Sequence, residues 1–294
     1  MNAPVATTVS VIVPSYNAMA FVGQAVKSAL DSPGLDVEVI EVDDGSTDGT
    51  LTVLKQFDGR VRTVRQERGG PYRARNLGAH LARGSWLAFL DADDDWLPGK
   101  LAAQLKLADE HVDLVYTDRL NFGNLSRVKE RQSESVTLHD GDIFEPLLLG
   151  NFITLSSVLI RKSAFEKLGG FAVDRRGVQD WDMWLRYAAS GGLVALCSEP
   201  LTRYRIHAEQ MTNDLEERAA DREAVLRRAL ASPRGQRVSK RVVRQAFAGL
   251  WELAASQTAG RQWWRTIDCY VRAAAYWPWN PRVYKGMVKG LLGR

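Results

Sequence analysis

VSVIVPSYN, residues 9–17, is a run of β-branched residues that stops at a proline and continues into polar side chains. Three further short apolar runs follow along the chain, at residues 37–42, 61–66 and 86–90. Runs of this length and composition are typical of buried strands. Between the first two runs, and again between the last two, apolar residues recur at helical spacing. This alternation predicts an α/β fold of βαβ units around a mostly parallel sheet.

The pattern becomes mixed after residue 95. We predict helices at residues 101–108, 163–168 and 181–189, and strands at residues 113–117 and 155–161. Beyond about residue 214 the spacing indicates helices alone, with breaks at residues 232–233 and 278–281. We therefore expect an α/β domain of residues 1–214 and a helical C-terminal region of residues 215–294.

The composition is that of an ordinary globular chain, with 45% hydrophobic and 25% charged residues among 294. Residues 1–8 have neither the basic region nor the apolar run of a secretory signal. The longest apolar stretch, residues 144–160, is interrupted and falls short of the roughly 20 residues that a spanning helix needs. Cys197 and Cys269 are the only cysteines, which favours neither a disulfide framework nor a zinc site. We expect a cytoplasmic protein.

Charge is unevenly distributed along the chain. Residues 215–294 hold 16 Lys and Arg against 6 Asp and Glu, a charge of +10, so the preceding residues carry −6 within the total of +4. Five of the nine tryptophans also lie in this C-terminal region. Basic charge mixed with tryptophan is typical of a surface that binds anionic membrane, here at the inner face of the cell membrane. Tryptophans that pack a helical core are the alternative.

Polar side chains follow each of the first four predicted strands. In a doubly wound parallel sheet ligands bind outside the carboxyl ends of the strands, so these side chains are expected at one edge. Four of the five residues 91–95 are aspartates, and their repulsion is relieved by a hard divalent cation with oxygen ligands. We predict a Mn²⁺ or Mg²⁺ ion here; a solvated acidic turn is the alternative.

Other motifs for metal and phosphate are absent from the sequence. Trp96 stands where an EF-hand loop needs glycine, and Asp94 stands where a Walker A loop ending at Lys100 needs glycine. No G-x-G-x-x-G follows the first strand, and no H-E-x-x-H occurs. These absences count against a nucleotide hydrolase, a dinucleotide oxidoreductase and a metalloprotease.

Four segments, taken in order, resemble the motifs of the family-two inverting glycosyltransferases. They are VSVIVPSYN (9–17), VDDGSTDGT (42–50), ARNLG (74–78) and FLDADD (89–94). The resemblance covers about residues 9–210 and implies the GT-A fold, a Rossmann-like sheet flanked by helices. It also implies transfer of a sugar from a nucleotide diphosphate sugar, with UDP as the expected carrier, to a hydroxyl of a glycan or lipid-linked acceptor.

The resemblance also implies roles for residues at the strand ends. Pro14, Tyr16 and Asn17 would line the nucleoside pocket, and Asp44 would accept a hydrogen bond from the base. Each has a structural alternative, because an aspartate after a strand also caps helices and a tyrosine also fills cores.

Three further residues receive roles in the same way. Arg75 would help to hold the nucleotide, Asp91 would face the ribose, and Asp93 would bind the cation that bridges the two phosphates. The cofactor implied is therefore a divalent cation, and the donor is the partner that it helps to bind.

The segment QDWDMWLR, residues 179–186, resembles the part of these enzymes that carries the catalytic carboxylate before a helix. Asp180 is the candidate base, with Gln179 and Trp181 as neighbouring substrate contacts and Asp182 as a helix-start carboxylate. The alternative is that both aspartates only begin the helix. The family often has Glu-Asp where this chain has Gln-Asp. His207, in a segment that resembles the family's closing motif, is a candidate metal ligand or a structural histidine.

Three other functions remain open from the sequence. A sugar nucleotidyltransferase is expected to have a glycine-rich phosphate loop after the first strand, where this chain has residues 14–17. A nucleotide-sugar-binding module without turnover is conceivable because glutamine replaces glutamate at Gln179. Nucleic-acid binding through the basic C-terminal region is disfavoured, because no recognised module accompanies the charge.

Overall fold

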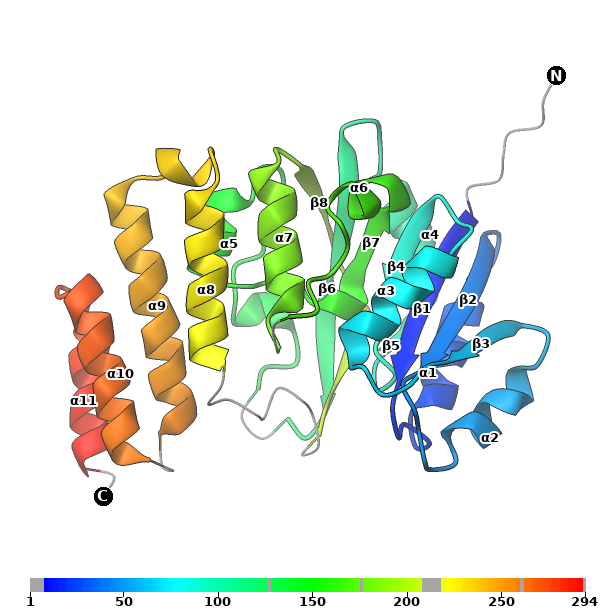
Figure 1. Ribbon diagram of the computed structural model, residues 1–294, viewed down its shortest axis with the longest axis horizontal. Helices are drawn as coiled ribbons and strands as arrows, with labels where there is room; N and C mark the ends of the chain where they lie inside the picture. The colour runs from blue at the N-terminus through cyan, green and yellow to red at the C-terminus, as the bar shows by residue number, and fades with distance from the viewer. Residues whose placement is uncertain (1–7, 126–127, 175–176, 208–217, 260–261, 293–294) are drawn as a thin grey trace. The chain divides into compact units, whose positions relative to one another are not determined.

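The computed structural model describes residues 8–125, 128–174, 177–207, 218–259 and 262–292 (Figure 1). The chain forms two compact units. The first unit comprises Met1–Asp142, Phe152–Val173 and Gly192–His207, and the second comprises Ile143–Asn151, Asp174–Gly191 and Ala208–Arg294. The domain boundary expected near residue 214 lies outside the described residues and stays a prediction.

The first unit is built on an eight-stranded sheet of order β3-β2-β1-β4-β7-β6-β8-β5. Its strands are β1 (Thr8–Ser15), β2 (Asp36–Asp43), β3 (Val61–Arg65), β4 (Trp86–Phe89), β5 (Asp95–Trp96), β6 (Val112–Gly123), β7 (Val158–Arg161) and β8 (Leu193–Ile206). Neighbours among β1 to β4 are parallel, as are β6 and β8. β7 is antiparallel to both β4 and β6. The predicted α/β class, mostly parallel sheet and first four strands are confirmed.

The later strands differ from the prediction in several places. β5 is not predicted, and β6 continues to Gly123, beyond the expected residues 113–117. The strand expected at residues 155–161 begins only at Val158, because Leu155–Ser157 forms a 3₁₀ turn. The sequence pattern does not predict β8 at all. β8 pairs with β6 through a register shift between Thr117 and Arg119, so the strand does not keep one simple alternation of side chains.

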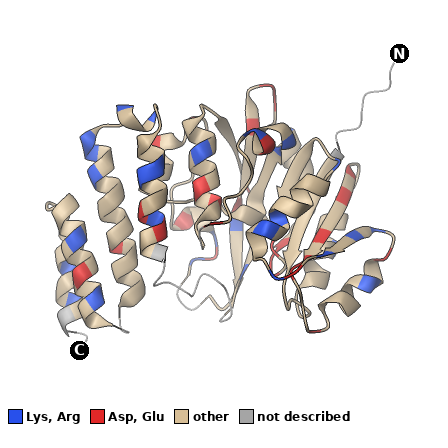
Figure 2. Cartoon of the chain, viewed as in Figure 1, with Lys and Arg blue, Asp and Glu red and all other residues tan. Residues whose placement is uncertain are grey.

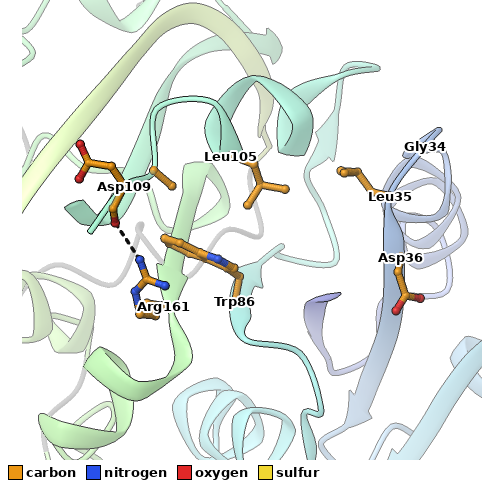
Figure 3. Close-up of a pocket in the computed structure, with 8 residues that line it drawn as sticks. Gly34, Leu35, Asp36, Trp86, Leu105, Asp109 and Arg161 are labelled. Atoms are coloured by element: carbon orange, nitrogen blue, oxygen red, sulfur yellow. Dashed lines mark hydrogen bonds between the residues drawn. The ribbon is translucent and has the colours of Figure 1, made fainter. Parts of the chain in front are cut away.

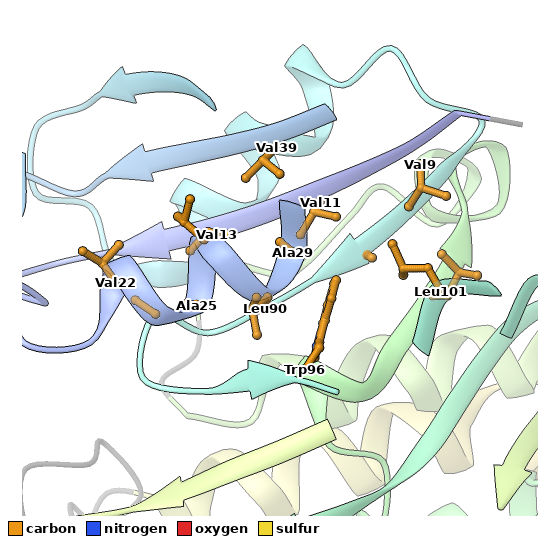
Figure 4. Packing of buried hydrophobic residues seen from close by; sticks show 14 of the residues in the cluster. Val9, Val11, Val13, Val22, Ala25, Ala29, Val39, Leu90, Trp96 and Leu101 are labelled. Carbon is orange, nitrogen blue, oxygen red and sulfur yellow. The ribbon is translucent and has the colours of Figure 1, made fainter. Parts of the chain in front are cut away.

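Helices cover both faces of the parallel half of the sheet. The first unit contains α1 (Val22–Leu30), α2 (Thr50–Leu54), α3 (Pro71–Leu81), α4 (Lys100–Leu105) and α6 (Lys162–Lys167), with 3₁₀ turns at Lys55–Phe57 and Gln132–Glu134. Figure 4 shows Val22 and Ala25 of α1 beside Val11 and Val13 of β1, all of them fully buried. Ile12 points to the other face, because successive strand residues alternate.

α3 packs closely on that second face. A Cβ atom added to Gly78 would lie 2.6 Å from Cγ2 of Ile12, closer than real Cβ contacts allow. Glycine at this position therefore lets α3 approach β1 and carry Arg75 to the carboxyl edge of the sheet. We expect a larger residue here to push the helix away from the sheet.

The regular elements of the second unit are all helices among its described residues. It contains α5 (Phe144–Leu149), α7 (Gln179–Ala189), α8 (Arg218–Ala231), α9 (Lys240–Thr258), α10 (Trp263–Tyr276) and α11 (Pro281–Leu292), with a 3₁₀ turn at Gly235–Arg237. The predicted C-terminal helices and their two breaks are confirmed. Figure 2 shows Lys and Arg recurring along α8 to α11. Among the described helices, none is both long enough and apolar enough to cross a membrane.

Glu41 of β2 predicts a pH dependence of stability. Its side chain is fully buried, and Oε2 has no hydrogen-bond partner, while Oε1 accepts a bond of 2.6 Å from Ser15. Burial, with Asp43 adding to it, raises the pKa of Glu41 to about 7. The folded state thus binds a proton that the unfolded state has released. The free energy of unfolding should fall by about 2–3 kcal/mol as pH rises from about 4.5 to about 7.

Glu41→Gln mimics the protonated form, so we expect it to stabilise the protein above pH 7 and flatten this slope. Urea unfolding at acidic and at mildly alkaline pH measures the difference. Glu38 on the same strand is the control: burial opposes ionisation there, but bonds from Ser10 and Arg83 outweigh it and lower its pKa. Glu38→Gln should destabilise at neutral pH. An unchanged slope in Glu41→Gln would contradict the assignment.

Candidate functional site

Hydrogen bonds join the loops after β1 and β2 at the carboxyl edge of the sheet. Oδ1 of Asn17 accepts a bond of 2.9 Å from the Thr47 amide, and the Asn17 amide donates one of 2.9 Å to Oγ of Ser46. Asn17 has a φ of 48°, in the left-handed region that asparagine tolerates better than most residues. These bonds join the two loops in which the nucleoside-binding residues were expected.

The expected nucleoside-binding residues differ in exposure. Pro14 is buried inside β1 opposite Val42, so its side chain is part of the sheet. Tyr16 is 38% exposed, and the guanidinium carbon of Arg68 lies 4.2 Å from the centre of its ring. Asn17 is exposed. Tyr16 and Arg68 thus offer a planar aromatic surface and a cation at the edge, both suited to a nucleoside and its phosphates.

The carboxylate of Asp44 accepts hydrogen bonds from the loop that leads into α3. Its Oδ1 accepts bonds of 2.7 Å from Nε2 of Gln66 and from the Gly69 amide, and its Oδ2 accepts one of 2.8 Å from the Gly70 amide. A carboxylate offers about four acceptor sites, three of which these bonds occupy, and Asp44 is only 4% exposed. The role expected for Asp44 in binding the base stays a prediction.

The acidic loop after β4 forms a compact group of carboxylates. Within the described part of the chain, one ligand oxygen each from Asp91, Asp93 and Asp94 lies within 4.8 Å of the others. Burial raises the pKa of Asp93, and the neighbouring Asp91 raises it further. Burial and these two neighbours also raise the pKa of Asp94 well above its usual range. Three crowded oxygen donors of this kind fit a hard divalent cation, which would relieve their repulsion.

The fourth aspartate of the loop has a different role. Asp95 is buried, and its two oxygens accept bonds of 2.5 and 2.8 Å from Nε and Nη2 of Arg203 on β8. Nε2 of Gln24 on α1 donates a further bond of 2.6 Å to Asp95. This planar, two-bond pairing ties the acidic loop to two elements of the unit. Asp95 therefore supports the loop and does not belong to the three-carboxylate group.

Arg75 and His207 both contact this carboxylate group. Nη2 of Arg75 on α3 forms an ion pair with Asp91, and the Arg75 side chain is only 4% exposed. Nε2 of His207, just past the end of β8, lies 3.0 Å from Oδ2 of Asp93. The structure thus brings together Arg75, Asp91, Asp93 and His207. A histidine at this distance hydrogen-bonds the carboxylate, and its role as a metal ligand stays a prediction.

The candidate base lies in the second unit. Asp180 is half-buried in the first turn of α7, and Oδ2 accepts a bond of 2.9 Å from Nδ2 of Asn151. Its neighbours Gln179 and Trp181 are 6% and 7% exposed. Nε1 of Trp181 donates a bond of 2.8 Å to the carbonyl of Leu147, which gives this ring a structural contact within the unit. Their expected contacts with substrate stay predictions.

Asp182 is a buried carboxylate that pairs with two arginines, in addition to lying in the first turn of α7. Its side chain is 1% exposed and accepts bonds of 2.8 Å from Nε of Arg186 and from Nη1 of Arg228. The pair with Arg186 lies within α7, and the pair with Arg228 joins α7 to α8. The stability cost expected from a helix-start carboxylate, at most about 1 kcal/mol, therefore understates the effect of removing it.

Sequence reasoning missed the residues that hold the acidic loop in place. Arg203 and Arg205 belong to β8, and the Arg205 amide donates a bond of 3.0 Å to Oδ1 of Asp94. Ser156 contacts the same loop from the turn before β7. The alternation of Arg203 and Arg205 along β8, continued by His207 just past its end, is a signal that could have indicated a shared face. Ser156 has no comparable signal, because only the pairing of β7 with β4 brings it there.

A separate hollow of about 450 Å³ lies at the opposite edge of the sheet. It is lined by residues at the amino ends of β2 and β4, and Figure 3 shows Trp86 beside Arg161 within it. The guanidinium of Arg161 already pairs with Asp113 and donates a bond of 2.8 Å to the Asp109 carbonyl. This hollow is distinct from the edge where the carboxylates gather.

The fold and the acidic loop together define a class, the glycosyltransferases with the GT-A fold. Residues 10–169 match the family model described as Glycosyl transferase family 2. The chain belongs to this family, as the sequence motifs predicted.

Relatives of known sequence agree with this membership. The chain is 30% identical to an uncharacterized glycosyltransferase of Rickettsia prowazekii over 70% of its length and 66% of that protein. Over 35% of its length it is 44% identical to the putative teichuronic acid biosynthesis glycosyltransferase TuaG of Bacillus subtilis, covering 42% of that protein. The chain thus spans less than two thirds of the length of these two relatives.

Solved structures confirm the GT-A fold. Residues 1–349 of S. aureus TarS, crystallised with UDP-GlcNAc, match 97% of this chain and 89% of that one with a TM-score of 0.71 and 15% identity. The mannosyltransferase PcManGT of Pyrobaculum calidifontis, in complex with GDP-Man and Mn²⁺, matches 97% of this chain and 85% of that one, with a TM-score of 0.57 and 19% identity.

Proposed function

We propose that the chain is an inverting glycosyltransferase that transfers a sugar from a UDP-sugar to an acceptor hydroxyl during synthesis of a cell-surface glycan. The observation that carries this proposal is the group formed by Asp91, Asp93 and Asp94 at the carboxyl edge of the sheet in a family 2 glycosyltransferase. Nucleotide-sugar complexes of TarS and PcManGT support a nucleotide-sugar donor, and TuaG supports a glycan product.

The first unit binds the donor in this proposal. Tyr16, Asn17 and Asp44 hold the nucleoside, while Arg75 orients Asp91 toward the ribose. Asp93, with the adjacent carboxylates and His207, would hold a divalent cation, Mn²⁺ or Mg²⁺. When bound, such a cation neutralises charge on the diphosphate leaving group.

Asp180 removes the proton from the acceptor hydroxyl in this proposal. The acceptor oxygen attacks the anomeric carbon, the bond from that carbon to the diphosphate breaks, and the configuration inverts in a single displacement. Gln179 and Trp181 shape the contact with substrate around Asp180. This mechanism needs no second catalytic carboxylate, unlike the paired carboxylates of retaining hydrolases.

Thermal unfolding with a panel of nucleotide sugars, with Mn²⁺ and with chelator, tests the donor, because a ligand that binds only the native state raises its apparent stability. We expect a UDP-sugar to stabilise the protein only when the metal is present. Product analysis with the labelled sugar then separates the functions. Transfer to an acceptor supports a glycosyltransferase. Release of pyrophosphate from a nucleoside triphosphate as a sugar phosphate is joined to it supports a nucleotidyltransferase, and binding without turnover supports a binding module.

We also propose that the C-terminal helices dock on anionic membrane, where a lipid-linked acceptor would lie. Trp263, Trp264 and Trp279 are 44%, 55% and 86% exposed, whereas Trp251 is buried in the helical core. α10 and α11 carry five Lys or Arg residues and one acidic residue, Asp268. Exposed tryptophan beside basic charge suits the headgroup region.

Liposome sedimentation should show stronger binding to anionic than to neutral vesicles at low salt, and weaker binding as salt increases. Each Lys or Arg at such a surface contributes about 1 kcal/mol. The double variant Lys285→Glu and Lys289→Glu should therefore lose most of this preference. Lys240→Glu with Arg241→Glu makes the same charge change on exposed residues of α9 and should lose less. Equal binding of both vesicle types would contradict docking.

A further inference from the structure

Ser156 lies in the 3₁₀ turn Leu155–Ser157, directly before β7, and its side chain is fully buried. Its hydroxyl contacts two positions of the acidic loop. Oγ accepts a bond of 3.1 Å from the amide of Asp91 and donates one of 2.6 Å to Oδ2 of Asp94. The carbonyl of Ser156 accepts a further bond of 2.7 Å from Nε1 of Trp96. One residue thus contacts the acidic loop at the amide of Asp91, at the carboxylate of Asp94 and at the indole of Trp96 just beyond.

The hydroxyl is suited to this double contact. A serine hydroxyl offers one hydrogen to donate and two lone pairs that accept, so it can bond a carboxylate and an amide at the same time. The bond to Asp94 involves an acid and is stronger than a neutral one. Its length of 2.6 Å is short for a bond between oxygens. Together the two bonds set the separation between the backbone at Asp91 and the carboxylate of Asp94.

Arg205 on β8 also holds the acidic loop in place. The Arg205 amide donates to Oδ1 of Asp94 at 3.0 Å, and Nε of Arg205 donates to the carbonyl of Asp93 at 2.9 Å. The loop is therefore held at three successive points from Asp91 to Asp94. The Asp93 side chain lies between these contacts and is 31% exposed, so a ligand can reach it.

We propose that Ser156 is a positioning residue for cation binding: its hydroxyl fixes the carboxylate of Asp94 relative to the backbone of Asp91, and so sets the geometry in which the acidic loop would bind a divalent cation. The inference rests on the proposed function, because it assumes that the acidic loop binds a cation. Ser156 acts through Asp91 and Asp94 and does not itself touch the cation. Groups that orient metal ligands in this way often change metal affinity about 10–100-fold when they are removed.

The neighbouring Ser157 provides a matched control. It belongs to the same turn, is equally buried, and donates a bond of 2.6 Å from Oγ to the carbonyl of Thr154. That bond lies within the turn and does not involve the acidic loop. Ser157→Ala therefore removes a hydroxyl of the same size and burial without removing a contact to the carboxylates.

The experiment measures Mn²⁺ binding to Ser156→Ala, Ser157→Ala and the unchanged protein by electron paramagnetic resonance, without donor, together with the melting temperature of each. We expect Ser156→Ala to weaken Mn²⁺ binding about 10-fold or more, and Ser157→Ala to stay within about 2-fold at a similar loss of melting temperature. In the turnover assay, Ser156→Ala should need more Mn²⁺ for half-maximal rate and recover most of its rate at saturating Mn²⁺.

Equal Mn²⁺ affinity in Ser156→Ala and the unchanged protein would overturn the positioning role while leaving the cation site intact. Equal weakening in both serine variants would also overturn it, because the effect would then belong to the stability of the turn. If the unchanged protein binds no more Mn²⁺ than Asp93→Ala, the cation site itself is wrong, and the inference fails with it.

Discussion

Asp180→Asn should lower turnover about 10²–10⁴-fold while leaving the affinities for nucleotide and metal close to those of the unchanged protein. The amide has the shape of the carboxylate and can still accept the bond from Asn151, but it cannot take a proton from the acceptor. Single-turnover rates with saturating donor measure the chemical step, and calorimetric titration with UDP and Mn²⁺ measures binding.

Asp182→Asn, three residues into the same helix, is not a clean control, because Asp182 pairs with both Arg186 and Arg228. We expect it to cost about 2–3 kcal/mol of stability by leaving these cations without their carboxylate. Asp268→Asn on α10 is the better control, since its pair with Arg272 is about half exposed and contributes little. Near-normal turnover in Asp180→Asn would mean that another group accepts the proton.

Asp93→Ala should abolish the metal-dependent part of nucleotide binding and lower turnover at least as strongly. It removes the most exposed oxygen donor at the centre of the acidic loop. The fold should survive, because Arg205 bonds the carbonyl of Asp93, which alanine retains. Removing one of three crowded carboxylates also relieves repulsion. Calorimetric titration of UDP with Mn²⁺, and again with chelator, isolates the metal-dependent part.

Asp58→Ala is the control for Asp93→Ala, because Asp58 is an exposed acid in the same unit that accepts a bond of 3.0 Å from the amide of the next residue, Gly59. Its metal-dependent binding should match that of the unchanged protein. If Asp93→Ala binds UDP with an undiminished response to Mn²⁺, the assignment of the ligand is wrong. His207→Ala, measured beside it, distinguishes a ligand from a hydrogen-bond partner: a ligand's loss weakens Mn²⁺ binding, whereas a partner's loss leaves it near normal.

The first half of the fold could be predicted because its signals are local. Apolar runs such as residues 9–13 and 86–90 form strands, and the polar residues after them meet at one edge by a general property of parallel sheets. β8 could not be predicted, because its charged and polar residues are accommodated by pairing with β6 and not by a buried face of its own. Its strand character depends on a neighbour more than 70 residues earlier in the chain.

The candidate site could also be predicted only in part. The sequence alone shows the aspartates of the cluster, Asp91, Asp93 and Asp94. Asp95 looks equivalent in sequence, but it pairs with Arg203 on a distant strand. Adjacent identical side chains can therefore have different roles, and only the tertiary contacts separate them. The same holds for the tryptophans of the C-terminal region, of which Trp251 is buried and Trp279 is exposed.

The antiparallel pairing of β7 with β4 limits the protein scaffolds into which the acidic loop could be engineered. Trp86 lies opposite Arg161 and Ala88 opposite Leu159, and continuing that register beyond the ladder sets Asp91 opposite Ser156. A slip of one residue would turn β7 over and present a different side chain. Transfer of the DADDD segment alone into another parallel sheet would omit the antiparallel strand β7, which positions Ser156 against the acidic loop. An engineered copy of this site therefore needs both strands, β4 and β7, in their native register.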